Sequence, residues 1–151
     1  MNKPPTMDES IRTAAYDLFR QAKESLQTQD FASAERCCME GWGLIPEPKY
    51  GWDSSYMCLL YVVRFLRGAR CYDLAMKLVH EYLLSGYHHD YVYGPYFWLG
   101  TLHFEKGEMA EAFGQFDRAN KMSAGRCFKE EDPRYKSFYK AFKTRGRPKI
   151  N

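Results

Sequence analysis

The sequence lacks a long hydrophobic run. The longest uninterrupted apolar segment, Met57–Val63, ends at Arg64, far short of the roughly 20 apolar residues that a membrane-spanning helix needs. The first ten residues, MNKPPTMDES, carry prolines and acids, whereas a secretory signal has a basic region followed by an apolar stretch. We therefore expect a cytoplasmic protein without a membrane-spanning helix.

Paired cysteines and catalytic motifs are also missing. The five cysteines are an odd number and no two are spaced as C-x-x-C, so we expect buried thiols, with no disulfide or metal site. His88, His89 and Asp90 are adjacent, a spacing that rarely directs three side chains to one metal ion. No phosphate-binding G-x-x-x-x-G-K-[ST] motif is present. The sequence thus predicts no enzyme, no metal and no cofactor.

What the sequence does contain is a helical repeat, most clearly in Pro95–Ala124. The first half of this copy has a stripe at positions i, i+3, i+4 and i+7 of a helix, formed by Tyr96, Leu99, Gly100 and His103. Gly107 then marks a turn. The second half has another helical stripe, formed by Met109, Ala112, Phe113, Phe116 and Ala119. This copy therefore predicts two short helices joined as a hairpin.

Two weaker copies precede it. The equivalent positions are Leu18, Ala22, Phe31, Ala34 and Pro46 in the first copy and Leu59, Val63, Tyr72, Ala75 and Val79 in the second. The interval between Ala34 and Ala75 is 41 residues, and that between Ala75 and Ala112 is 37. We therefore predict an all-α fold with antiparallel helical hairpins over about 8–46, 53–86 and 94–123, within a single domain of residues 1–143.

A capping helix is predicted after the third hairpin, over about 132–143. Asp132 and Pro133 suit the start of a helix. An aromatic stripe follows at i, i+3, i+4 and i+7, formed by Tyr135, Phe138, Tyr139 and Phe142, while Lys136, Lys140 and Lys143 take another face. A stack of hairpins leaves an apolar end that such a helix covers.

The hairpins resemble tetratricopeptide repeats. The residues that fall on that family's signature positions are Tyr96, Leu99, Gly100, Gly107, Ala112, Phe116 and Ala119. The family's usual period is about 34 residues, so the extra length is expected in the connections 46–53 and 86–94. The resemblance implies a solenoid that binds a protein by its inner surface. The positions it implies for that contact are Phe19, Lys23, Leu60, Arg64, Arg67, Phe97, Thr101 and Glu105.

Charge is divided unevenly along the chain. Residues 1–122 hold 13 Lys and Arg against 16 Asp and Glu, a net charge of −3, while residues 123–151 hold 9 against 3, a net charge of +6. In the basic tail, residues 144–151, Arg145 and Arg147 belong to an Arg-Gly-Arg-Pro segment that resembles the core of an AT-hook, which lays arginines into the minor groove of DNA. The alternative is a solvated basic end whose attraction to phosphate has no sequence preference.

Several segments resemble short bacterial tetratricopeptide proteins that act as immunity partners of secreted polymorphic toxins. These segments are Trp42, 45–49, Trp52, 94–100, 125–128, 131–135 and Phe138. The resemblance implies that the chain neutralises one cognate toxin domain by binding and occluding it. A nuclease toxin would suit the acidic body, because its basic active cleft would be attracted there. Two alternatives stay open: a secretion chaperone of tetratricopeptide type for an exported protein, and a DNA-associated adaptor that uses the basic tail.

Overall fold

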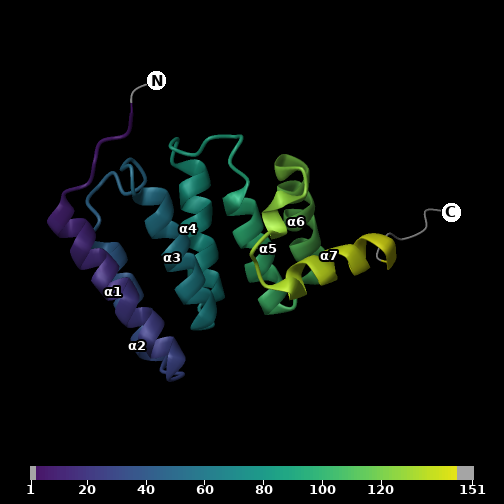
Figure 1. Ribbon diagram of the computed structural model, residues 1–151, viewed down its shortest axis with the longest axis horizontal. Coiled ribbons are helices and arrows are strands. Elements are labelled where there is room, and N and C mark those ends of the chain that lie inside the picture. The colour runs from purple at the N-terminus through teal and green to yellow at the C-terminus, as the bar shows by residue number, and fades with distance from the viewer. Residues whose placement is uncertain (1–2, 146–151) are drawn as a thin grey trace. The chain divides into compact units, whose positions relative to one another are not determined.

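The chain is built from helices (Figure 1). The computed structural model describes residues 3–145, which contain seven α-helices, one short 3₁₀ helix and no β-strand. The helices are α1 (Glu9–Gln27), α2 (Phe31–Leu44), α3 (Ser55–Gly68), α4 (Tyr72–Leu84), α5 (Gly94–Lys106), α6 (Met109–Ser123), η1 (Arg126–Phe128) and α7 (Pro133–Arg145). The predicted all-α class is confirmed.

The same turn joins α1 to α2, α3 to α4 and α5 to α6. The backbone N–H groups of Asp30, Cys71 and Glu108 each donate to the carbonyl five residues earlier, over 2.9, 2.8 and 2.9 Å. The residue before each donor has a positive φ: Gln29 (57°), Arg70 (62°) and Gly107 (81°). This is the hydrogen-bond pattern of a Schellman helix end. The turn recurs after 41 and then 37 residues, the intervals read from the sequence.

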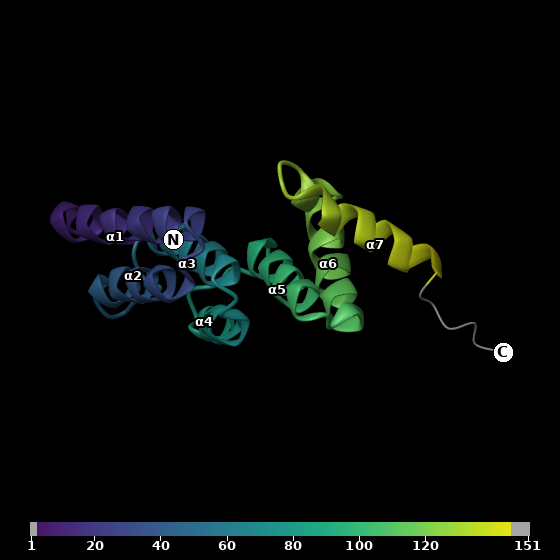
Figure 2. The same ribbon diagram turned by 90° about the horizontal axis from the view of Figure 1, so that it is seen from below.

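Residues 3–88 form the first of two compact units and contain α1 to α4. Figure 2 shows α1 and α3 in one layer of this unit and α2 and α4 in the other. A glycine lets the layers approach closely: a Cβ added at Gly41 of α2 would lie 2.7 Å from Cε1 of Phe19 in α1. Such a short separation is possible only because Gly41 has no side chain.

The connection between α2 and α3 is an ordered part of the first unit. The Lys49 ammonium donates to the carbonyls of Trp42 and Ile45, over 2.9 and 2.8 Å, and so satisfies the end of α2. The indole of Trp52 donates to the Pro46 carbonyl over 2.9 Å. The residues of this connection that carry the resemblance to immunity proteins therefore have structural partners here.

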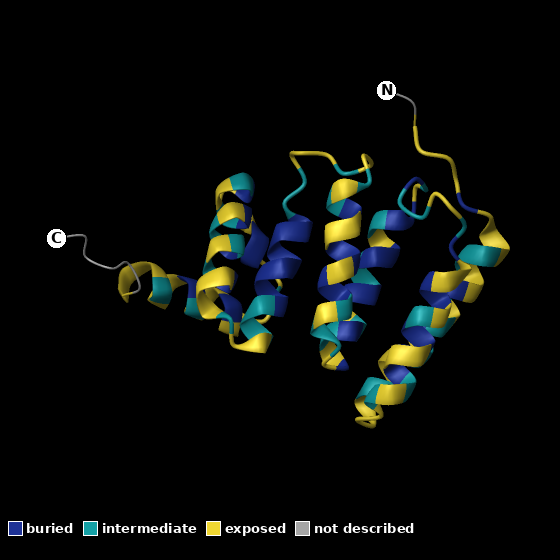
Figure 3. Ribbon diagram, turned by 180° about the vertical axis from the view of Figure 1, so that it is seen from behind, coloured by how far each residue is buried: buried dark blue, intermediate teal, exposed yellow. Residues whose placement is uncertain are grey.

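The second unit, described to residue 145, contains α5, α6, η1 and α7. Gly100 allows α5 and α6 to pack closely, because a Cβ there would lie 2.6 Å from Cδ1 of Phe116. Figure 3 shows how much of α5 is buried, and residues 94–102 are all buried. The predicted capping helix is present as α7, which buries Tyr135 and Tyr139. The single-domain prediction for residues 1–143 stays a prediction, and the chain divides into two compact units near residue 88.

Candidate functional site

Five of the predicted binding residues lie in the first unit, on α1 and α3. Phe19 is only 2% exposed and belongs to the core. Lys23 and Arg64 are exposed, and Leu60 and Arg67 are half-buried. Four of the five therefore have side-chain surface that a partner can reach, while Phe19 does not.

A row of half-buried aromatic rings crosses from α1 to α3. The Tyr16 and Tyr61 rings meet edge to face with centroids 5.7 Å apart, and the Tyr61 and Phe65 rings are stacked with centroids 6.2 Å apart. Phe19 lies under this row, 6.4 Å from Tyr61. The rings hold one another in place, so a partner that contacts them would order few additional side-chain torsions.

The phenol of Tyr16 stays protonated at neutral pH. Burial raises the pKa of Tyr16 to about 12, with a further contribution from Cys58, while the Arg12 guanidinium acts in the opposite direction. The Tyr16 ring therefore contributes no charge to this face.

Three cations share the helix sides that carry the aromatic row. Arg12 lies near Tyr16, Lys23 follows Phe19 by one helical turn, and Arg64 is one turn from Tyr61. The α3 segment contains no Asp or Glu. Arg20, also on α1, is paired with Asp17 and Glu24, over 2.5 and 2.7 Å. We call this surface the α1–α3 face and define it by Arg12, Tyr16, Lys23, Tyr61, Arg64 and Phe65.

A shallow open depression runs along α1 next to this face. Its lining includes Glu9, Thr13, Tyr16, Asp17 and Arg20. Because a single helix supplies these residues, the depression is an open surface and encloses no small molecule. It does widen the area next to Tyr16 over which a protein could make contact.

In the second unit, the cap covers the predicted binding positions. Phe97 is 3% exposed, with Phe128 and Tyr135 meeting its ring edge to face at centroid distances of 5.6 and 6.2 Å. Thr101 is fully buried, and its hydroxyl donates to the Trp98 carbonyl over 2.7 Å. Neither Phe97 nor Thr101 presents a side chain to a partner, and the Phe97 ring is covered by η1 and α7.

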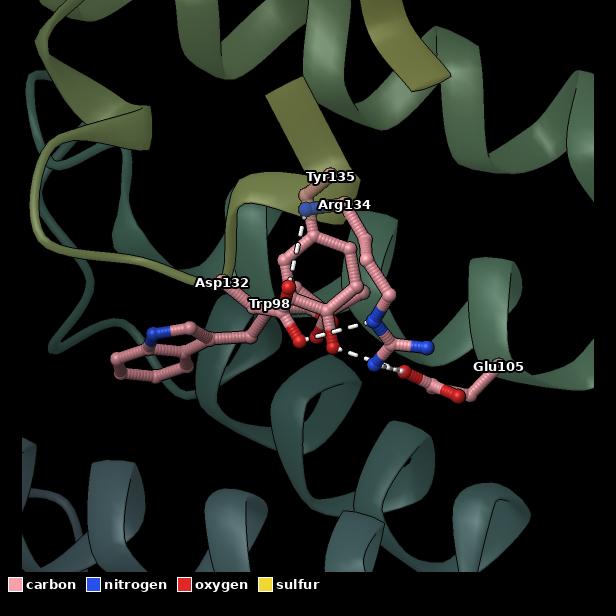
Figure 4. A network of polar contacts seen from close by, with 6 residues as sticks. Trp98, Glu105, Asp132, Arg134 and Tyr135 are labelled. Carbon is pink, nitrogen blue, oxygen red and sulfur yellow. Dashed lines mark hydrogen bonds and ion pairs between the residues drawn. The ribbon is translucent and has the colours of Figure 1, made fainter. Parts of the chain in front are cut away.

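Glu105, on α5, holds the start of the capping helix α7 in place (Figure 4). Its carboxylate accepts a hydrogen bond from the Arg134 guanidinium and another from the Tyr135 hydroxyl, each over 3.0 Å. Arg134 is held in turn by Asp132 over 2.9 Å. This network joins α5 to the start of α7. The Glu105 carboxylate is therefore engaged in hydrogen bonds inside the second unit.

Two of the cysteines are poor nucleophiles at neutral pH. Burial raises the pKa of Cys38 to about 12 and that of Cys71 to about 11, so neither is a thiolate at neutral pH. Among residues 3–145, no three His, Cys, Asp or Glu side chains lie close enough together to hold a metal ion. Within the same range, no helix is both long enough and apolar enough to cross a bilayer.

The two arginines predicted to contact nucleic acid lie at the end of the chain. Arg145 is the exposed last residue of α7, and Arg147 lies outside the described residues. Three further basic residues precede the tail on α7: Lys136, Lys140 and Lys143, all of which are exposed.

The contact positions predicted from the sequence do not include four residues of the α1–α3 face: Arg12, Tyr16, Tyr61 and Phe65. A signal for them was present. Tyr16 and Arg12 precede Phe19 by three and seven residues, which places all three on one side of a helix. Tyr61, Arg64 and Phe65 stand at i, i+3 and i+4 in the same way.

Comparison with known proteins gives no match. No family model matches the chain, and neither a curated protein nor a solved structure does so.

Proposed function

We propose that this chain is a tetratricopeptide-like module that binds one protein through its α1–α3 face, and that it is an immunity protein which neutralises a cognate secreted toxin by occluding it. The repeat assignment is supported by the Schellman turn that recurs at three places. It is also supported by Ala34, Ala75 and Ala112, each fully buried at the start of the second helix of a pair. Small residues at these points let paired helices approach closely.

The observation that carries the binding proposal is the aromatic row Tyr16–Tyr61–Phe65 with Arg12, Lys23 and Arg64 around it. Aromatic residues and arginine dominate the binding energy of protein interfaces. Rings that are already packed against one another lose little entropy on binding. The α1–α3 face thus combines anchors in fixed positions with charges that select a partner.

The charge of this face specifies its partner. The cations around the row favour a toxin surface rich in Asp and Glu. If the toxin is a nuclease, it would dock here through an acidic surface and not through its basic cleft, so inhibition would come from steric occlusion. This replaces the simpler expectation that the net charge of residues 1–122 attracts a basic cleft.

The same charges favour an immunity protein over a secretion chaperone. A chaperone that cradles an apolar segment needs a continuous hydrophobic groove. Lys23 and Arg64 are exposed on the α1–α3 face, and Arg12 is half-buried beside Tyr16. Polar and charged groups around an aromatic centre are typical of a specific protein–protein interface.

The proposal is tested by affinity capture and charge reversal. Tagged full-length protein is used to capture partners from nuclease-treated host extract, and the affinity for the retained protein is then measured with purified components. We expect Lys23→Glu/Arg64→Glu to weaken binding by at least about tenfold, equivalent to about 1.4 kcal/mol. Circular dichroism should show unchanged helical content.

The matched control is Arg36→Glu/Lys77→Glu. These side chains are 63% and 70% exposed, lie on α2 and α4, and give the same change of net charge. We expect this variant to bind like the wild type. Equal affinities for both double variants would show that the α1–α3 face is not the contact surface. A captured partner with no toxic activity would remove the immunity role but keep the binding role.

A further inference from the structure

The helix α7 has two chemically different sides. One side packs aromatic rings into the second unit: Tyr135 and Phe138 meet Phe104 edge to face, with centroids 5.3 and 5.2 Å apart. Phe142 stacks on Phe113 with centroids 4.8 Å apart. These contacts fix which side of α7 faces the unit and which faces solvent.

A different side of α7 carries a stripe of lysines. Lys136, Lys140 and Lys143 stand at i, i+4 and i+7 and are all exposed. At 1.5 Å of rise per residue, they span about 10 Å of helix axis. We call these three residues the lysine stripe.

Two of the three lysines in the stripe have no carboxylate partner among residues 3–145. Between residues 3 and 145, no ion pair or hydrogen bond reaches the ammonium of Lys136 or Lys140. Lys143 lies over the Tyr139 ring at 5.7 Å and interacts with the Asp117 carboxylate of α6, so the free cations of the stripe are Lys136 and Lys140. The α7 segment has no Asp or Glu. By sequence, residues 133–151 contain seven Lys and Arg and no acid. On α1, by contrast, Arg20 has two carboxylate partners.

We propose that the lysine stripe binds the phosphate backbone of double-stranded nucleic acid without sequence preference. This is a second binding function, on a different unit from the α1–α3 face and independent of it. Phosphates follow one another at about 3.4 Å of axial rise along one strand of DNA, so the stripe spans about three phosphate steps. Attraction of this kind releases counterions and supplies most of non-specific binding.

The composition of the stripe favours nucleic acid over an acidic protein. Tight protein interfaces depend on buried aromatic or aliphatic anchors. The exposed neighbours of the stripe, Ser137, Ala141 and Thr144, are small side chains. A surface of cations without anchors suits a partner with closely spaced charges.

The packing of α7 also disfavours a membrane surface. An interfacial helix binds lipid by burying its apolar side among the acyl chains. On α7 much of that side is packed: Tyr135 is 2% exposed, and Phe142 stacks on Phe113. What remains open is a small depression lined by Phe138, Ala141, Phe142 and Arg145. Insertion of the whole side into lipid would require Tyr135 and Tyr139 to leave the core of the second unit.

The proposal differs from minor-groove binding by the tail. An AT-hook contact would depend on Arg145 and Arg147 and would prefer A·T-rich duplexes. Contact by the lysine stripe depends on Lys136 and Lys140 and has no such preference. The two therefore predict different effects of substitution and of DNA sequence.

The test is a fluorescence anisotropy titration of full-length protein with labelled 24-base-pair duplexes, one A·T-rich and one G·C-rich, at about 50 to 200 mM salt. The wild type is expected to bind both duplexes equally and to lose affinity steeply with salt. Lys136→Glu/Lys140→Glu should weaken binding at least about tenfold and reduce the slope of log K against log salt by about 2. Its melting temperature should be unchanged, since both side chains are exposed.

Two controls separate the stripe from net charge and from the tail. Arg36→Glu/Lys77→Glu changes the net charge equally and should bind duplex within about twofold of wild type. Deletion of residues 146–151 should leave most of the affinity. The proposal is overturned if both double variants weaken binding equally, if only the tail deletion does so, if the wild type shows no salt-sensitive binding, or if vesicles with phosphatidylserine compete more strongly than duplex.

Discussion

Replacing Gly100 with alanine tests the packing between α5 and α6. The added Cβ would lie 2.6 and 2.7 Å from Cδ1 and Cε1 of Phe116, well inside van der Waals contact. Phe116 cannot move aside easily, because it is fully buried and its ring lies 5.4 Å from Phe97 and 5.5 Å from Phe128. Either the two helices separate or the aromatic cluster repacks.

The size of the effect follows from two opposing contributions. Overpacking a filled core costs about 1–3 kcal/mol, whereas replacing glycine by alanine inside a helix gains about 1 kcal/mol. Gly114→Ala, in α6, isolates the second contribution because a Cβ there meets nothing within 4 Å. We therefore expect Gly100→Ala to be less stable than Gly114→Ala by about 1–3 kcal/mol.

Urea unfolding followed by circular dichroism measures this difference. The midpoint for Gly100→Ala should lie below that for Gly114→Ala, with similar slopes m, because the surface exposed on unfolding is nearly the same. Thermal melts should differ in the same direction, by about 2–4 °C per kcal/mol for a chain of this size. Equal midpoints for the two variants would refute the close approach of α5 and α6.

Two further predictions concern stability. Lys49→Met removes the ammonium that satisfies two carbonyls at the end of α2, so we expect a loss of about 2 kcal/mol in urea unfolding; a loss no larger than that of the exposed control Lys77→Met would contradict this. Burial raises the pKa of Asp117, but hydrogen bonds from Lys121 and Tyr139 lower it more, and the net pKa lies below its ordinary 3.8. The stabilisation by Asp117 is therefore present above that value and is lost as the pH falls through the folded pKa. Asp117→Asn should lower stability at neutral pH and flatten its decline in acid, measured by urea unfolding at each pH; an unchanged pH profile would show that Asp117 contributes nothing.

Local patterns in the sequence predicted the helices and their spacing. Gly107 was expected as a turn and has φ 81°, and the intervals between Ala34, Ala75 and Ala112 match those between the observed turns. The left-handed residues Gln29 and Arg70 could not be recognised. Neither is glycine, so only the helix ends around them require that conformation.

Contacts between elements were harder to predict. Helical periodicity places Phe97 and Thr101 on one side of α5, but it does not say that η1 and α7 cover that side. The rings of Phe128 and Tyr135 show that they do. The aromatic row on the α1–α3 face was missed for the same reason, since Tyr16 and Tyr61 are 45 residues apart in sequence. Periodicity describes one helix at a time, while a binding surface depends on pairs of helices.

Site-specific photocrosslinking tests the central claim most directly. A benzoylphenylalanine is placed at position 61, in the aromatic row of the α1–α3 face, or at position 80, where His80 is exposed on α4 of the other layer. With the partner obtained by affinity capture, we predict strong crosslinking from position 61 and little from position 80. Crosslinking from position 80 alone would contradict the account and place the partner on the opposite layer.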